Sequence, residues 1–236
     1  MVNLLAAKAE VVFAVQLVTR HRAPRLAALL GLGVAALAAA SEPSPERVAR
    51  VTMLVAGMLA AVAASRLLAP GPALASARIV VAPWWLVPAG RILGVLCVVG
   101  PVTVGMGLAL ASASPQGSPI VGPAAVALTF AACVASCTMA LAPWWGASAT
   151  ASVGFLGVWF GGVPPSSLAA LFTGWLPLQR VLLWLWNVLP LPWRAARWLS
   201  SGGWGDPLLL GAWTLIGLGV AAMHLAGPRR PRQAES

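Results

Sequence analysis

Three cysteines and two histidines are the side chains of this sequence with the widest chemical repertoire. Cys133 and Cys137 are four residues apart, which places two thiols on one face of a helix, where they could act as soft metal ligands. No histidine or acidic residue is near them in the sequence to complete such a site. These two cysteines and Cys97 fall within long apolar stretches, so we expect them to pack against neighbouring helices and predict no metal site.

Serine and histidine suggest a second chemistry, because an intramembrane serine protease pairs these residues across two helices. Only Ser148 or Ser152 with His224 offers that pairing here. The local sequence GASAT departs from the GxSG motif of rhomboid-type proteases, and His224 is predicted near the wrong face of the membrane. We therefore predict no catalytic residue and no enzymatic activity in this chain.

Energy-coupling residues are also missing from the sequence. A phosphate-binding loop ends in a lysine followed by serine or threonine, whereas Lys8, the only lysine, precedes Ala9. Ion-driven carriers keep a carboxylate or histidine inside the membrane, and His224 is the only such residue in the predicted spans. We expect no cofactor in this chain and no ion coupling through it.

The elements that position these residues follow from the charge distribution. From Ile92 to Gln179 the sequence contains no Asp, Glu, Lys, Arg or His, and 60% of all residues are hydrophobic. A helix needs about 20 mostly apolar residues to cross a bilayer, so this stretch alone holds three crossings. The sequence predicts an all-α polytopic membrane protein with one transmembrane domain over residues 1–236.

Six membrane spans are predicted after an amphipathic elbow helix at 3–22, for which a seventh span is the alternative. The elbow has Leu4, Val11, Val15 and Val18 on one side, with Lys8, Glu10, Gln16 and Arg20 elsewhere. The spans are predicted at 26–41, 50–68, 92–112, 119–142, 147–164 and 207–227.

Basic residues set the predicted orientation. The net charge is +10, and the arginines gather in the amino end, in the connector after the second span and in the tail at 228–236. By the positive-inside rule these three regions face the cytoplasm, together with both termini. Because the arginines are single or in short clusters at span ends, we expect no nucleic-acid binding.

Two long connectors stand out. The segment at 69–91 is predicted to be cytoplasmic, with a short amphipathic stretch before Pro83 and Pro88. The segment at 163–206 is predicted to lie in the outer interface or to re-enter the outer leaflet, because it is too apolar for water. Within it, Ser166 to Val188 can form one helix with Thr173, Arg180 and Asn187 as a polar stripe, ended by Pro190 and Pro192.

This layout resembles the permease subunits of type-2 ABC exporters. The resemblance covers nearly the whole chain in architecture and is specific over about 66–100. In that region one stretch runs from Arg78 through Ile79 to Pro83, and a second runs from Leu86 through Pro88 to Arg91. The sequence departs from the family at Ser65, because an acidic residue commonly accompanies the arginine there.

The resemblance implies a dimer of permeases, identical or not, in the inner membrane of a bacterium. Each would dock on a cytoplasmic ATPase that binds ATP and Mg. The residues implied in coupling to that ATPase are Arg78, Pro83, Trp84, Trp85 and Arg91, with possible elbow contacts from Lys8 and Arg20. Thr52, Met53 and Met58 would line the path of an exported apolar or amphiphilic cargo. The alternative function is a non-catalytic accessory or assembly subunit of a larger membrane complex.

Overall fold

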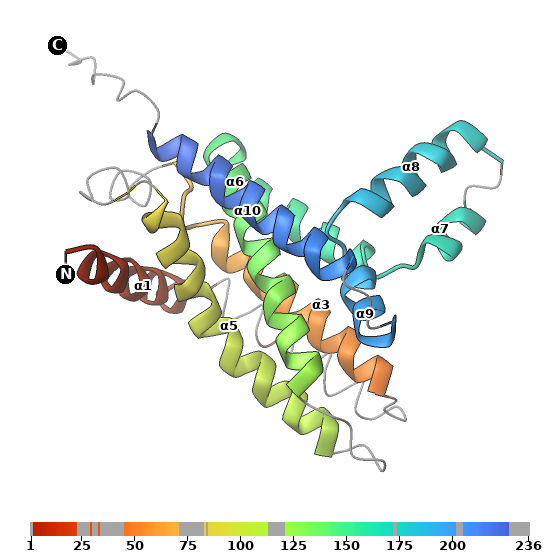
Figure 1. Ribbon diagram of the computed structural model, residues 1–236, viewed down its shortest axis with the longest axis horizontal. Coiled ribbons are helices and arrows are strands. Elements are labelled where there is room, and N and C mark those ends of the chain that lie inside the picture. Colours follow the sequence, from red (N-terminus) through yellow and green to blue (C-terminus); the bar gives the residue numbers. More distant parts are fainter. Residues whose placement is uncertain are drawn as a thin grey trace.

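The computed structural model describes residues 2–22, 29, 33, 45–70, 83, 85–112, 121–171, 174–201 and 205–226. Every element of regular structure in these ranges is an α-helix (Figure 1). The helices are α1 (Val2–Arg20), α3 (Pro45–Ala64), α5 (Leu86–Ser112), α6 (Val121–Phe160), α7 (Pro165–Leu171), α8 (Leu176–Val188), α9 (Pro192–Ser201) and α10 (Gly205–Ala226). The predicted all-α class is confirmed.

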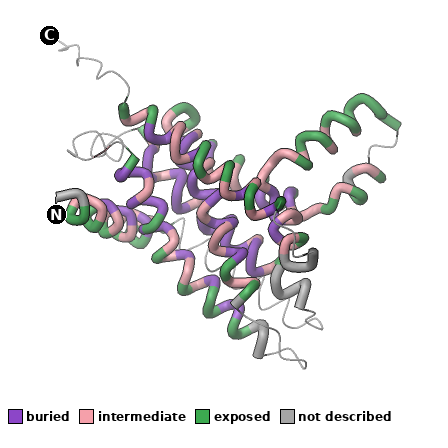
Figure 2. The backbone as a smooth tube through the Cα atoms, viewed as in Figure 1, coloured by how far each residue is buried: buried purple, intermediate pink, exposed green. Residues whose placement is uncertain are grey.

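Three of the described helices, α5, α6 and α10, are long and apolar enough to cross a membrane. They pack with α3 into a bundle, while α1 lies against the beginning of α5 and the α7–α8 pair projects from the opposite end (Figure 1). Buried residues concentrate along α3 and the helices around it (Figure 2). The chain is thus a helical membrane protein. The span predicted at 26–41, apart from residues 29 and 33, and the tail at 228–236 lie outside the described residues.

Helix α6 is 40 residues long and turns back on itself at Gly146. Gly146 has φ 75° and ψ 169°, which is far from helical geometry. A methyl group placed at Gly154 would lie 3.4 Å from Oγ1 of Thr138, so residues on opposite sides of Gly146 are neighbours. The break falls between the two helices predicted at 119–142 and 147–164. The α6 segment is therefore a helical hairpin.

The hairpin closes tightly on α3 because small residues line the contact. A methyl group at Gly57 of α3 would lie 2.6 Å from the Phe130 ring and 3.0 Å from Val158, one residue from each half of α6. A methyl group at Gly154 would lie 2.9 Å from Cβ of Ala61. Both halves of the hairpin thus pack on the same helix, which makes α3 the centre of the core.

Replacing Gly146 with alanine is expected to destabilise the protein by roughly 1–3 kcal/mol, because φ 75° with ψ 169° is a conformation almost confined to glycine. No atom of the described residues lies within 4 Å of the added methyl group, so the effect comes from the backbone. The measurement is unfolding by SDS in mixed micelles, followed by helical circular dichroism. The control is Gly105→Ala in α5, where the described residues also leave open space around the added methyl group. Equal stability of the two variants would contradict the assigned turn.

Two predicted elements differ from the helices of the structure. Helix α5 begins at Leu86, so residues 86–91 of the predicted connector are already helical. Pro88 is accommodated because the first turn of a helix needs no backbone N–H from it.

The single helix predicted over Ser166–Val188 is instead the pair α7 and α8. The described residues between them include a turn at Gly174, and Pro177 lies at the beginning of α8. The predicted end of the helix before Pro190 and Pro192 is confirmed, and a further short helix, α9, begins at Pro192.

Candidate functional site

The residues implied in coupling gather at the beginning of α5, as far as the structure describes them. Pro83 is half-buried and Trp85 is 54% exposed. Arg78 and Trp84 lie outside the described residues. Lys8 and Arg20 are exposed on α1. The assignment of these residues to an ATPase contact stays a prediction, and Trp85 is a large exposed side chain at this end of α5 that a partner could reach.

Arg91 differs from them because its side chain is completely buried. Its Nε donates a hydrogen bond to Oε2 of Glu10 at 2.7 Å, and its Nη1 donates to the backbone carbonyl of Leu67. The guanidinium carbon also lies 4.8 Å from the centre of the Phe13 ring. A single side chain in α5 thereby connects α1 and the turn that follows α3.

Two glycines in α5 let α1 approach closely enough for this ion pair. A methyl group at Gly90 would lie 2.9 Å from Cβ of Glu10. At Gly94 it would lie 2.5 Å from Cβ of Ala14 and 2.9 Å from the carbonyl oxygen of Val11. We name the contact of Glu10 and Ala14 with Gly90, Arg91 and Gly94 the α1–α5 joint.

The joint shows which residues of α1 face the rest of the protein. Glu10, Ala14 and Val18 are the buried residues among those described in the helix, whereas Leu4, assigned to its apolar side, is 79% exposed. Glu10 was expected away from the apolar side because an isolated carboxylate is costly to bury. Glu10 is nevertheless buried, because Arg91, far away in the sequence, supplies its counter-charge. Val18, which was assigned to the apolar side, is buried as well.

A buried ion pair adds little net stability, but removing one partner is costly because the other remains buried and unpaired. The Arg91–Glu10 pair therefore fixes the position of α1 on α5 more than it strengthens the fold. With no exposed surface, Arg91 cannot itself contact a partner protein in this conformation. It can instead hold in place the neighbouring segment that would contact a partner protein.

Thr52, Met53 and Met58, implied in lining a substrate path, are all buried in the chain's own core. They lie on α3, which is packed against both halves of α6. These side chains do not border an open surface in this conformation, so their assignment to a path stays a prediction.

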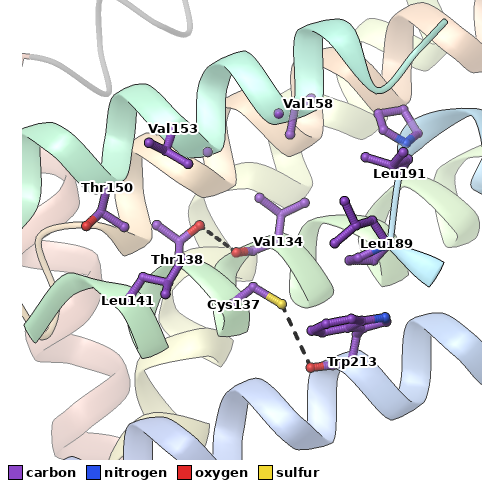
Figure 3. Close-up of a pocket in the computed structure, with 14 residues that line it drawn as sticks. Val134, Cys137, Thr138, Leu141, Thr150, Val153, Val158, Leu189, Leu191 and Trp213 are labelled. Atoms are coloured by element: carbon purple, nitrogen blue, oxygen red, sulfur yellow. Dashed lines mark hydrogen bonds between the residues drawn. The ribbon is translucent and has the colours of Figure 1, made fainter. Parts of the chain in front are cut away.

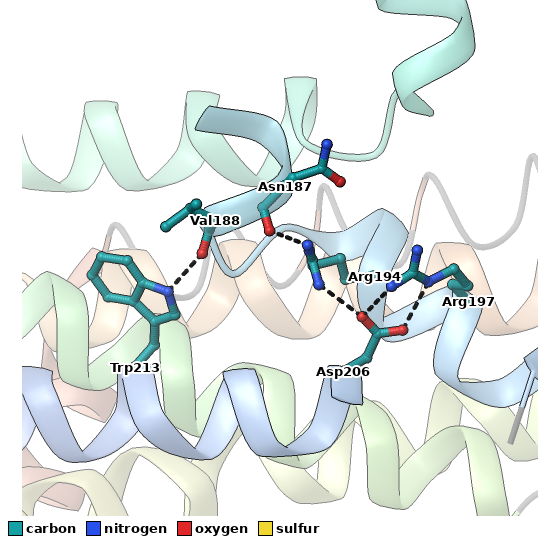
Figure 4. Close-up of polar contacts among 6 residues, drawn as sticks. All are labelled: Asn187, Val188, Arg194, Arg197, Asp206 and Trp213. Carbon is teal, nitrogen blue, oxygen red and sulfur yellow. Dashed lines mark hydrogen bonds and ion pairs between the residues drawn. The ribbon is translucent and has the colours of Figure 1, made fainter. Parts of the chain in front are cut away.

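A second buried charge lies at the opposite end of the bundle, at the beginning of α10. Asp206 is buried and accepts hydrogen bonds from Arg194 at 2.9 Å and from Arg197 at 2.8 and 2.6 Å (Figure 4). Arg194 also donates to the carbonyl of Asn187 at the end of α8. The carboxylate raises the pKa of Arg197, so its guanidinium stays charged. This cluster holds α8, α9 and α10 together.

A signal for this cluster is present in the sequence, although the predicted sites did not include it. Asp206 is the only acidic residue between Glu46 and Glu235, and Arg194 and Arg197 precede it closely in a long apolar region. A lone acid with nearby arginines in such a region indicates a buried pair.

An apolar hollow of about 260 Å³ lies between the halves of the hairpin, α10 and the α8–α9 connector (Figure 3). Its polar groups are engaged in internal hydrogen bonds. Thr138 donates to the Val134 carbonyl at 2.6 Å, and Cys137 lies with its sulfur 3.9 Å from the Trp213 carbonyl. The indole of Trp213 donates to the Val188 carbonyl at 2.8 Å. The hollow is therefore suited to apolar groups.

Comparison with protein-family models, with curated proteins and with solved structures found no match for this chain. Within the described ranges, no three His, Cys, Asp or Glu side chains form a cluster that could hold a metal ion.

Proposed function

We propose that this protein is the permease subunit of an ATP-driven membrane transporter, similar in plan to type-2 ABC exporters, and exports an apolar or amphiphilic cargo. The observation that carries the proposal is the α1–α5 joint, because its residues Gly90 and Arg91 are the last two residues of the 69–91 segment. In the plan of a type-2 ABC exporter, an ATPase that moves the 69–91 segment must also move α5.

The joint suits this role because it leaves α1 and α5 little freedom to move separately. The methyl-sized gaps at Gly90 and Gly94 are already filled by Glu10 and Ala14. Sliding the helices would separate Arg91 from Glu10 inside the protein, at a cost of about 3–5 kcal/mol. A force applied near the exposed Trp85 would thus move α1 and α5 together.

In this proposal the energy comes from a cytoplasmic ATPase subunit that holds ATP and Mg, since the chain itself lacks a phosphate-binding loop. The permease would act as a dimer in a bacterial inner membrane, with both termini in the cytoplasm. Exposed apolar residues along α5 and α10, such as Leu93, Leu215 and Ile216, leave surfaces for lipid and a second subunit. The apolar hollow favours a cargo with apolar parts.

The proposal is tested by purifying the tagged chain from its native membrane in mild detergent and identifying the proteins that remain in stoichiometric amount. We expect a soluble protein with a phosphate-binding loop at about one per chain, and vanadate-sensitive ATP hydrolysis by the complex. Recovery of other membrane subunits alone, in several detergents, would favour the accessory-subunit alternative instead.

A further inference from the structure

A second hollow, also of about 260 Å³, lies beside the Asp206 cluster. It is bordered by Arg50 of α3, by Gly162, Pro164 and Pro165 after α6, and by Trp193, Ala196 and Arg197 of α9. We name it the α3–α9 hollow. Its walls come from three separate parts of the sequence, which are held together by the packing of α9 on the bundle.

Among the described residues that border this hollow, the side chains with hydrogen-bonding groups can only donate. Arg50 and Arg197 carry guanidinium groups, and Trp193 carries an indole N–H. Among the described residues the Trp193 indole nitrogen is buried and has no acceptor. A buried donor without an acceptor is costly, so this position favours a ligand that accepts hydrogen bonds.

Counted over the described residues, the charge balance of the neighbouring cluster favours an anion. Arg194 and Arg197 both bind Asp206, so two guanidinium groups share one carboxylate there. Arg50 adds a further guanidinium at the border of the hollow. Arg197 remains 48% exposed although it is paired, so part of its guanidinium is accessible to a ligand.

We propose that the α3–α9 hollow binds the phosphate of an anionic membrane phospholipid through Arg50, Trp193 and Arg197. Arginine and indole donors match phosphate oxygens in hydrogen bonding, and the arginines add charge.

The surroundings favour a phosphate carried on a lipid over one free in water. Proline, glycine and alanine make up the rest of the described lining, and the apolar hollow begins on the adjoining residues Leu191 and Pro192. Trp175 and Trp184 on the projecting α7–α8 pair are exposed, as is typical of helices at the level of lipid headgroups. An acyl chain leaving the phosphate would meet apolar surface, whereas a small soluble phosphate would gain nothing from it.

The test is native mass spectrometry of the purified full-length chain, supplied with phosphatidylglycerol or phosphatidylcholine in detergent. The wild type is expected to retain one phosphatidylglycerol in preference to phosphatidylcholine. Arg50→Gln and Trp193→Phe should each weaken retention about tenfold, since each removes one donor to a charged group. Trp193→Phe keeps an aromatic ring where the indole lies 5.0 Å from the Arg197 guanidinium carbon, so the fold is preserved.

Arg180→Gln is the matched control, because Arg180 is exposed on α8 and does not border the hollow. It should retain lipid as the wild type does. Equal retention in all variants would overturn the proposal. A second arm adds glycerol phosphate or inorganic phosphate as competitor: displacement of the lipid at millimolar concentration would show a site for soluble phosphate and overturn the lipid assignment.

Discussion

Replacing Arg91 with methionine is expected to destabilise the protein by about 3–5 kcal/mol, because it leaves a buried charge without its partner. The methionine fills similar space but removes the group that now lies 2.7 Å from the Glu10 carboxylate, and it removes the donor to the Leu67 carbonyl. The measurement is the SDS midpoint of unfolding in mixed micelles, followed by tryptophan fluorescence.

The double variant Glu10→Leu with Arg91→Met separates the ion pair from simple packing. Because it removes both charges, it should recover most of the lost stability, as replacement of buried ion pairs by apolar residues often does. Arg20→Met, at an exposed position of α1, is the control and should unfold like the wild type. A double variant no more stable than Arg91→Met alone would contradict the role given to the pair.

Gly217→Ala is also expected to be among the most damaging changes. The added methyl group would lie 2.7 Å from the carbonyl carbon of Ser136 and 2.9 Å from the backbone nitrogen of Cys137. Backbone atoms of α6 cannot rotate out of the way, so α10 must move away from α6. We expect a loss of roughly 1–3 kcal/mol, the usual cost of overpacking.

The matched control is Gly219→Ala, two residues along the same helix. Its added methyl group meets no atom of the described residues within 4 Å, and alanine is a better helix former than glycine, so stability should stay equal or rise. Thermal unfolding in detergent measures both variants. If Gly217→Ala unfolded together with Gly219→Ala, the close contact of α10 with α6 would be wrong.

The helical class and the approximate positions of α3, α5, α6 and α10 could be predicted because uninterrupted apolar stretches are a local signal. The hairpin was predictable for the same reason, since the sequence around Gly146 interrupts the apolar pattern with Pro143 and two tryptophans. The division between α7 and α8 was not predicted, because the helical periodicity of the segment continues through Gly174 and Pro177.

The polar joints could not be predicted, because each depends on how separate helices pack. Glu10 and Arg91 are 81 residues apart, and each looks like a surface residue of an amphipathic segment when its local pattern is read alone. The burial of Thr52, Met53 and Met58 likewise follows from the packing of α3 against both halves of the hairpin. Only tertiary structure turns these residues inward.

Photo-crosslinking from position 85 is the most direct test of the proposed coupling role. A photoreactive phenylalanine analogue replaces Trp85 in cells, where the native partners are present, and the same analogue at the exposed Leu215 of α10 is the control. The proposed function predicts that position 85 crosslinks to a soluble ATPase subunit and that position 215 does not. Crosslinks from position 85 to lipid or membrane proteins alone would contradict it.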